Sequence, residues 1–350
     1  MLIIHNPLHS LHRGRQEMFR GRLVPCHEQP DRLEFILEEL RARRQHELQA
    51  PGEADMAVVR RIHTTPYLDF LTNAWSEWVA LDPANAELDV LPSIAPVRSF
   101  RTDVLPTNFA ARVGRYSFDT GSPLMAGTWA AAQSGAACAI DAARAVARSS
   151  SGGRRAAMAL TRPPGHHAGA DFYGGYCFLN NSAIAAQALL DAGAKRVAVL
   201  DVDYHHGNGT QSIFYERADV LTVSLHGDPM TEYPFYLGYA DETGAGAGAG
   251  WNLNLPMPGG TAFAVWKEAL DAALRRISEG GAEALVVALG LDTFEGDPIS
   301  SFKLTSADYL RMGEALAAAG LPTVFVTEGG YAARELGVNV ANVLEGFEAC

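Results

Sequence analysis

Short apolar runs alternate with amphipathic segments along most of the chain. A short run of aliphatic and β-branched residues is typical of a strand buried in a parallel sheet, whereas apolar residues at every third or fourth position are typical of a helix. The pattern predicts strands at 2–4, 58–63, 156–160, 197–200, 220–225, 284–289 and 323–326. It predicts helices at 32–45, 67–78, 129–147, 182–192, 210–216, 264–279 and 306–319, with a last helix at the C-terminus. This alternation predicts an α/β fold of three αβα layers with a central, mostly parallel sheet.

Four segments interrupt the alternation. The segment 7–30 is polar and irregular, and its length indicates a role at the surface. Prolines punctuate 82–125, which we interpret as a surface insertion or an oligomer contact outside the core. We expect a Ser/Gly linker at 149–153. The Gly/Ala repeat at 244–250 predicts a flexible loop, because it lacks the Lys-Ser/Thr pair of a phosphate-binding loop.

Composition narrows the class of protein. The 350 residues, 48% of them hydrophobic, can bury a sizeable core as one large domain or two smaller ones. The formal net charge of −12 disfavours nucleic acid as a partner. No apolar stretch approaches the roughly 18 residues of a membrane span. The four cysteines form no CxxC pair, and the first residues do not resemble a signal peptide. We therefore expect a cytoplasmic protein that binds neither membranes nor nucleic acid.

The densest chemistry follows the predicted strand at 197–200. Two carboxylates and two imidazoles come within six residues there: Asp201, Asp203, His205 and His206. Burying such groups unpaired inside a strand would cost several kcal/mol or more, so we expect the strand to end here and open into a site. Side chains two apart point the same way, so Asp203 and His205 can face one point. An Asp oxygen and a His nitrogen that converge form part of a transition-metal site, and zinc is the commonest occupant.

Three other strand ends carry polar groups, and each has a plain interpretation by itself. His166 and His167 could be surface histidines, Asp292 could cap a helix, and Tyr331 could belong to an ordinary turn. Together they match the parts of a metal-assisted hydrolase. Asp292 completes a set of three ligands, the histidines supply a base and an acid, and Tyr331 supplies a hydroxyl donor.

Longer motifs make the pattern specific. They are RPPGHHA at 162–168, GYCFLNN at 175–181, DVDYHHGNGT at 201–210, EGGY at 328–331 and HTTPYLDFL at 63–71. Together they resemble the zinc-dependent deacetylase family of the arginase–deacetylase fold, over nearly the whole chain. The stretches 172–181, 224–229 and 292–300 and the insertion are similar to the bacterial acetylpolyamine amidohydrolases within it. The resemblance implies one deacetylase domain over 1–350, with an elaborated loop at about 7–30 and an insertion at about 82–125.

The resemblance also implies two cation sites. Asp203, His205 and Asp292 would bind zinc, and the same ligands also suit ferrous iron. A structural potassium ion would be held by the backbone around Asp201, Asp203, His205, Ser224 and Leu225.

Catalytic roles follow from the same resemblance. His167 would be the general base and acid, and His166 a mainly electrostatic partner. Asp201 would orient His166, and Asn208 would contact His167, where a neutral amide raises the basicity less than the Asp found in one branch of the family. Tyr331 would donate a hydrogen bond to the substrate carbonyl and then to the oxyanion.

Recognition of the substrate is implied less directly. Tyr176 and Tyr233 fall where the family places the aromatic walls of a narrow channel. Glu17 falls where a carboxylate at the channel mouth would attract a cationic acetylpolyamine. Asp119 is a weaker candidate, more simply interpreted as a solvated surface acid. We expect the remaining polar groups near the motifs to be packed inside the protein: Cys177, His206 and His226.

Other functions fit parts of this pattern. The main function implied is zinc-dependent removal of acetyl groups from acetylputrescine-like polyamines, which releases acetate and the free amine. A protein-lysine deacetylase would need a more open rim than a homodimer built through 82–125 would leave. An arginase-like enzyme would need a third Asp after the central His, where Gly207 and Asn208 stand. A non-catalytic binding protein would not need the complete set of ligands, histidines and Tyr331.

Overall fold

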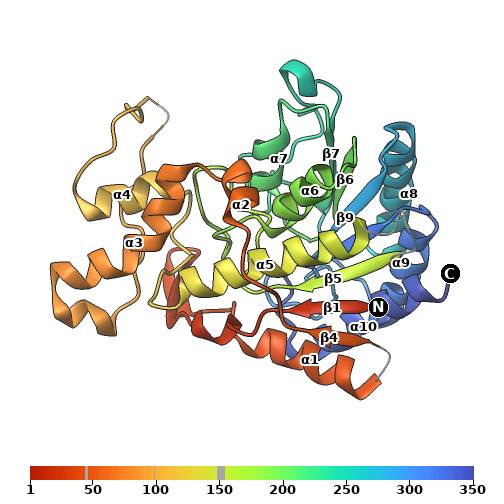
Figure 1. Cartoon of the computed structure of the whole chain (residues 1–350), viewed down its shortest axis with the longest axis horizontal. Coiled ribbons are helices and arrows are strands. Elements are labelled where there is room, and N and C mark those ends of the chain that lie inside the picture. Colours follow the sequence, from red (N-terminus) through yellow and green to blue (C-terminus); the bar gives the residue numbers. More distant parts are fainter. Residues whose placement is uncertain (44–45, 98, 148–153) are drawn as a thin grey trace.

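A single eight-stranded sheet forms the centre of the molecule (Figure 1). The computed structural model describes residues 1–43, 46–97, 99–147 and 154–350. The strand order is β4-β1-β5-β10-β9-β6-β7-β8, and every neighbouring pair is parallel. The strands are β1 (Leu2–His5), β4 (Glu47–Gln49), β5 (Ala156–Leu160), β6 (Val197–Asp201), β7 (Val220–Gly227), β8 (Asn252–Met257), β9 (Ala284–Leu289) and β10 (Thr323–Thr327). The predicted parallel sheet is confirmed.

Helices cover both faces of this sheet, which makes three layers. Side chains of β6 alternate between the faces: Val197 and Val199 belong to one core, and Ala198 and Leu200 to the other. The first core includes side chains from α2 (Met56–Ile62), α3 (Thr65–Leu81), α4 (Phe109–Tyr116), α5 (Thr128–Ala147), α6 (Asn181–Asp191) and α7 (Asn208–Phe214). The second includes side chains from α1 (Asp31–Arg43), α8 (Phe263–Glu279), α9 (Ser306–Ala317) and α10 (Ala333–Glu348).

Not every predicted element is present. The strand expected at 58–63 is wrong, because these residues form helix α2. Asp55 caps this helix by accepting the Ala57 N–H at 3.1 Å. Val58, Val59 and Ile62 are buried at helical spacing, so packing outweighs the strand preference of β-branched residues. Edge strands β4 and β8 were not predicted, since neither shows a continuous apolar run.

The two irregular segments are more ordered than expected. Within 7–30 lie a 3₁₀ turn, η1 (His9–Leu11), and an antiparallel hairpin of β2 (Gln16–Phe19) and β3 (Arg22–Pro25). Within 82–125 lie another 3₁₀ turn, η2 (Pro83–Glu87), and α4. The expectation that this insertion lies wholly outside the core is wrong. One face of α4 packs into the first core, as do Val90 and Leu124, which bond to each other through their main chains.

Of the two loops expected at 149–153 and 244–250, the structure describes the second. The Gly/Ala segment at 244–250 contains only a 3₁₀ turn, η4 (Gly246–Gly248), and joins no strand directly to a helix. The predicted linker at 149–153 lies outside the described residues. Within the described ranges, no helix has both the length and the apolar character needed to cross a bilayer.

Candidate active site

The ends of four adjacent strands build the site. Strands β5, β10, β9 and β6 are neighbours and parallel, so their carboxyl ends lie at one edge of the sheet. His166 and His167 follow β5, and Tyr331 follows β10. Asp292 follows β9, and the central motif follows β6. Residues far apart in the chain therefore meet at this edge, as is usual for sites in open α/β sheets.

Three of these residues form a compact ligand set. One ligand atom each from Asp203, His205 and Asp292 lies within 4.8 Å of the others. The His205 Nδ1 atom is 2.9 Å from an Asp292 carboxylate oxygen and 3.5 Å from one of Asp203. Both carboxylates are fully buried. Their orientation is set by main-chain donors, since Gly329 N–H bonds to Asp203 and Tyr204 N–H bonds to Asp292, each at 2.8 Å. Asp292 therefore does not act as a helix cap.

The electrostatics of this set fit a divalent cation. Burial and the neighbouring Asp203 raise the pKa of Asp292 to about 7. Burial opposes a charge on His205, but the bonds and charges of Asp203 and Asp292 outweigh it and raise its pKa to about 10. Two adjacent buried carboxylates require positive charge beside them, and a metal ion would supply it where a proton on His205 otherwise does. One nitrogen and two carboxylates suit zinc or ferrous iron.

The two neighbouring histidines differ in charge. Both are buried, and their ring centroids lie 3.9 Å apart. His166 Nδ1 is 2.9 Å from an Asp201 carboxylate oxygen. Burial alone would lower the pKa of His166, but the charges of Asp203 and Asp201 raise it to about 10. Burial and the positive charges of His166 and His205 lower the pKa of His167. At neutral pH, His166 is therefore charged and His167 is neutral.

The tautomer of His167 follows from its partner. Its Nδ1 lies 2.7 Å from the side-chain oxygen of Asn208, which only accepts hydrogen bonds. Nδ1 therefore donates, and Nε2 keeps its lone pair. His167 lines a pocket, so its free Nε2 is available as a base.

Tyr331 sits on a turn that buried charges hold in place. Arg32 donates to the carbonyl oxygens of Gly330 and Glu328, each at 2.6 Å. Its guanidinium carbon lies 4.7 Å from the centre of the Tyr331 ring. The Tyr331 N–H bonds to Asp297 at 2.7 Å. Burial raises the pKa of Tyr331, so the phenol is a proton-bearing donor at neutral pH.

Sequence reasoning did not identify Arg32 as part of the site. Its side chain reaches across from α1 to the turn after β10, and the guanidinium also bonds to the buried Glu28. Arg162, in the turn after β5, bonds to the same carboxylate. No spacing signal links Arg32 to the turn after β10, or Arg162 to Glu28, because these contacts join segments far apart in the sequence.

A cavity of about 340 Å³ opens beside these groups. Glu17, Asp119, Tyr176 and Tyr233 line it together with His167. Tyr176 lies edge-on to Tyr331, with ring centroids 5.7 Å apart, and Tyr233 lies edge-on to His167 at 5.1 Å. Aromatic rings therefore border the groups that carry the chemistry.

Both acidic candidates lie in the pocket wall, in settings that differ from those expected. Glu17 is only 1% exposed and sits on hairpin strand β2 rather than free in an irregular loop. The interpretation of Asp119 as a solvated surface acid is wrong. Its carboxylate accepts the Tyr233 hydroxyl at 2.8 Å and the Gly175 N–H at 2.7 Å, and so ties two walls of the pocket together.

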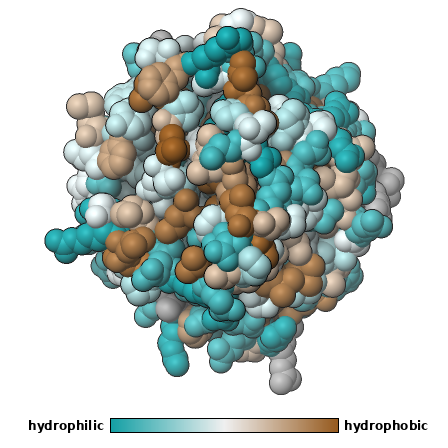
Figure 2. All heavy atoms as spheres, turned by 90° about the vertical axis from the view of Figure 1, so that its left-hand side faces the viewer, coloured by the Kyte–Doolittle hydropathy of each residue, from teal (hydrophilic) through white to brown (hydrophobic). Residues whose placement is uncertain are grey.

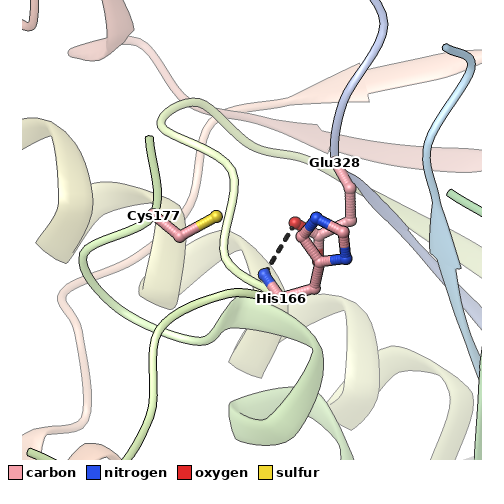
Figure 3. A group of neighbouring side chains, drawn as sticks. All are labelled: His166, Cys177 and Glu328. Carbon is pink, nitrogen blue, oxygen red and sulfur yellow. Dashed lines mark hydrogen bonds between the residues drawn. The ribbon is translucent and has the colours of Figure 1, made fainter. Parts of the chain in front are cut away.

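A second group of possible ligands is occupied by the protein itself. His166, Cys177 and Glu328 lie together (Figure 3), but the Glu328 carboxylate accepts the His166 main-chain N–H at 3.0 Å and the Ser182 hydroxyl at 2.7 Å. Burial raises the pKa of the Cys177 thiol, which donates to the Gly175 carbonyl. These contacts support a structural role for Cys177 and Glu328.

Two other histidines near the central motif, His206 and His226, lie away from the pocket. His206 and His226 are buried with their rings 4.5 Å apart. The Nδ1 atoms of both rings are within hydrogen-bond distance of the Ser224 hydroxyl, and His226 Nε2 donates to the Gly238 carbonyl. Neither side chain lines the pocket.

Known proteins match this chain along its length. Residues 26–347 match the histone deacetylase domain family. Acetylpolyamine amidohydrolase 2 of Pseudomonas aeruginosa is 52% identical over 348 residues, 99% of each chain. The acetylpolyamine amidohydrolase of Mycoplana ramosa is 50% identical over 347 residues, again 99% of each.

A solved structure supports the same grouping. The crystal structure of the acetylpolyamine aminohydrolase from Burkholderia pseudomallei has a TM-score of 0.92 to this chain at 40% identity, and the match covers 100% of this chain and 99% of that one. This chain therefore belongs to the histone deacetylase domain family, has its three-layer arginase–deacetylase fold, and is a hydrolytic deacetylase of a generally metal-dependent kind.

Proposed function

We propose that this enzyme removes acetyl groups from acetylated polyamines such as acetylputrescine and acetylcadaverine, releasing acetate and the free amine. The observation that carries the proposal is one pocket in which a metal-ligand set, His166, His167 and Tyr331 lie beside an acidic wall. The names of the two acetylpolyamine amidohydrolases described above support the same substrate class.

In this proposal, Asp203, His205 and Asp292 hold zinc or ferrous iron. Such an ion, when bound, supplies a Lewis acid for the acyl carbonyl and a water of lowered pKa. Around Asp201, Asp203, His205, Ser224 and Leu225, the backbone would hold a potassium ion. In support of that second site, Asp201 and Ser224 are partners in the register of β6 and β7 and are both buried.

The protein's own groups would carry the proton transfers. His167 Nε2 takes a proton from the attacking water and later gives it to the leaving amine, which is why a neutral imidazole is needed at the start. Asn208 and Asp201 hold the two imidazoles in orientation. The charged His166 stabilises developing negative charge, and Tyr331 donates to the oxyanion, a contact worth about 3–4 kcal/mol in other hydrolases.

Selection of a thin cation would come from the pocket wall. Tyr176 and Tyr233 enclose the acyl end, and the carboxylates of Glu17 and Asp119 make the wall attractive to an ammonium group. An uncharged amide gains none of this attraction, so Glu17→Ala should raise KM for acetylated diamines far more than for acetanilide. An equal effect on both would contradict a charge-reading role.

A panel of substrates tests the function. Metal-free protein is loaded with zinc or ferrous iron, and acetate release is measured from acetylated diamines, spermidine, spermine and an acetyl-lysine peptide. We expect kcat/KM for acetylated diamines to exceed that for the peptide by about tenfold or more, and no turnover without metal. A better peptide substrate would indicate a protein-lysine deacetylase. No acetate from any substrate, with metal bound, would indicate a binding protein.

We also propose that the whole chain, 1–350, acts as one domain and pairs into a homodimer through 82–125. Both cores pack on the same sheet, which supports one domain. Exposed apolar side chains in the insertion support the dimer. The four cysteines are free, which suits the reducing cytoplasm.

A further inference from the structure

Glu17 is held by two neighbours of different kinds. One of its oxygens, Oε1, accepts the Tyr176 hydroxyl at 2.8 Å and lies 2.8 Å from His27 Nδ1. The other, Oε2, accepts the His27 main-chain N–H at 3.2 Å. A hydrogen-bonded chain therefore runs from the pocket wall at Tyr176, through the buried carboxylate, to an imidazole.

His27 reaches solvent, unlike the carboxylate that it contacts. Its side chain is 26% exposed, whereas that of Glu17 is 1% exposed. Because a carboxylate only accepts hydrogen bonds, Nδ1 must donate in both protonation states of the ring. The proton that comes and goes is on Nε2. The imidazole can therefore gain or lose its charge without breaking the bond to Glu17.

We propose that His27 sets the net charge of the Glu17 wall, and so determines how strongly the pocket favours a cationic amine over an uncharged one. This inference rests on the proposed function. With His27 protonated, the pair is neutral and the wall attracts an ammonium group weakly. With His27 neutral, the carboxylate is uncompensated in a wall of low dielectric, where its field acts over several ångströms.

The pair should respond to pH near neutrality. The bond to Glu17 raises the pKa of His27 above its ordinary value, against the opposing effect of burial. As pH rises through that pKa, the ring loses its charge and affinity for the cation increases. The ammonium group of the substrate stays charged, since its pKa resembles that of lysine, about 10.4.

The test must separate titration of His27 from titration of the other ionisable groups near the pair. Burial raises the pKa of Cys26 to about 12, and burial also raises the pKa of Tyr176, so neither group ionises below pH 9. Asp297 also acts on His27, and its own pKa is raised by burial. The other ionisable side chains with acidic or basic groups in the pocket wall are Arg20, Asp119, Asp203 and Glu232, with His166, His167 and His205. All of these remain in a variant that lacks only His27.

The test compares two substrates of equal length. The ratio of kcat/KM for N-acetylputrescine to that for N-pentylacetamide is measured from pH 6 to pH 9, so that titration of the common catalytic groups cancels. We expect the ratio to rise about fivefold in the wild type. His27→Gln keeps a donor for Glu17 without a titratable proton, so its ratio should be high and flat. In Glu17→Gln, the ratio should be low and should not change with pH.

Further measurements separate this inference from the proposed function. Calorimetric binding of n-butylamine, which needs no turnover, should strengthen with pH in the wild type and not in His27→Gln. His9→Gln breaks a contact with Glu34 outside the pocket and should leave the wild-type profile unchanged. The inference would be overturned if the kcat/KM ratio and the amine affinity of the wild type did not change with pH. It would also be overturned if both changed with pH equally in His27→Gln. Hydrolysis of neither substrate, with pH-dependent amine binding intact, would overturn only the proposed function.

Discussion

At the scale of residues, the site depends on two adjacent imidazoles with opposite pKa shifts. His166 is paired with the carboxylate of Asp201, whereas His167 is paired with the neutral amide of Asn208. Burial lowers the pKa of His167, and the positive charge of His166 lowers it further. One carboxylate and one amide thus separate the roles of two identical side chains.

Removing the Tyr331 hydroxyl tests the oxyanion contact. We expect Tyr331→Phe to lower kcat by about 10²–10³ with little change in KM, because the lost bond strengthens in the transition state.

His167→Ala should lower kcat by about 10²–10⁴, because it removes the base. Both variants should retain the metal by elemental analysis. Wild-type turnover in either one would remove that residue from the mechanism.

Many single residues of the site could be predicted, and the reason is local. Asp203, His205, Asp292 and Tyr331 each lie within four residues of the end of a buried strand, so their motifs show where they lie. Arg32 could not be predicted in the same way. It lies in the first turn of an ordinary amphipathic helix, and its two main-chain acceptors, the carbonyls of Gly330 and Glu328, are about 300 residues further along the chain.

At the scale of elements, helix α1 positions the turn that carries Tyr331. Arg32 on this helix satisfies two carbonyl oxygens of the turn, and the ring of Tyr331 packs on its guanidinium group. The Tyr331 phenol is thus placed by a helix from the other end of the chain. A shift of about 1 Å in such a group can cost on the order of 10²-fold in rate.

Replacing Arg32 should therefore impair catalysis without removing the metal. We expect Arg32→Met to lower kcat by at least about tenfold and to lower the melting temperature, because buried acceptors lose their donor. Arg43→Met is the matched control, since Arg43 is the last residue of α1 and its ion pairs, with Glu39 of α1 and Glu345 of α10, lie away from the Tyr331 turn. It should change stability but not kcat. Equal losses of kcat in both variants would contradict a positioning role.

Elements with a clear apolar period were predicted well. The strand at 156–160 and the strand at 284–289 match the observed bounds. The error at 58–63 arose because a β-branched run is ambiguous, and the cap at Asp55 decides for a helix. Hairpin β2–β3 was missed because its strands are short and the buried Glu17 on β2 faces the pocket rather than an apolar core.

At the scale of the whole molecule, the insertion leaves apolar side chains uncovered. Figure 2 shows apolar residues on the face that carries α3 and α4. Those of the insertion with more than 45% exposure are Leu88, Ile94, Val97, Phe100, Val104 and Leu105. A surface of this kind is typical of a contact with another chain.

Charged substitutions on this face test the proposed homodimer. We expect the wild type to elute at the mass of two chains in gel filtration with light scattering, and Ile94→Asp combined with Phe100→Asp to elute at the mass of one. Val265→Asp is a matched control, since Val265 is similarly exposed on α8, outside the insertion. A wild type of single-chain mass at micromolar concentration would contradict the proposal.

The sequence by itself determined the parallel α/β architecture and the groups that gather at the strand ends, because apolar periodicity and residues adjacent to a strand are local properties. Only the tertiary structure decided the charge of each group. The neutral state of His167, the anchoring of Tyr331 by Arg32 and the pairing of Glu17 with His27 all depend on burial and on neighbours that the fold brings from distant segments. Electrostatic interactions act through space, so no linear pattern records them.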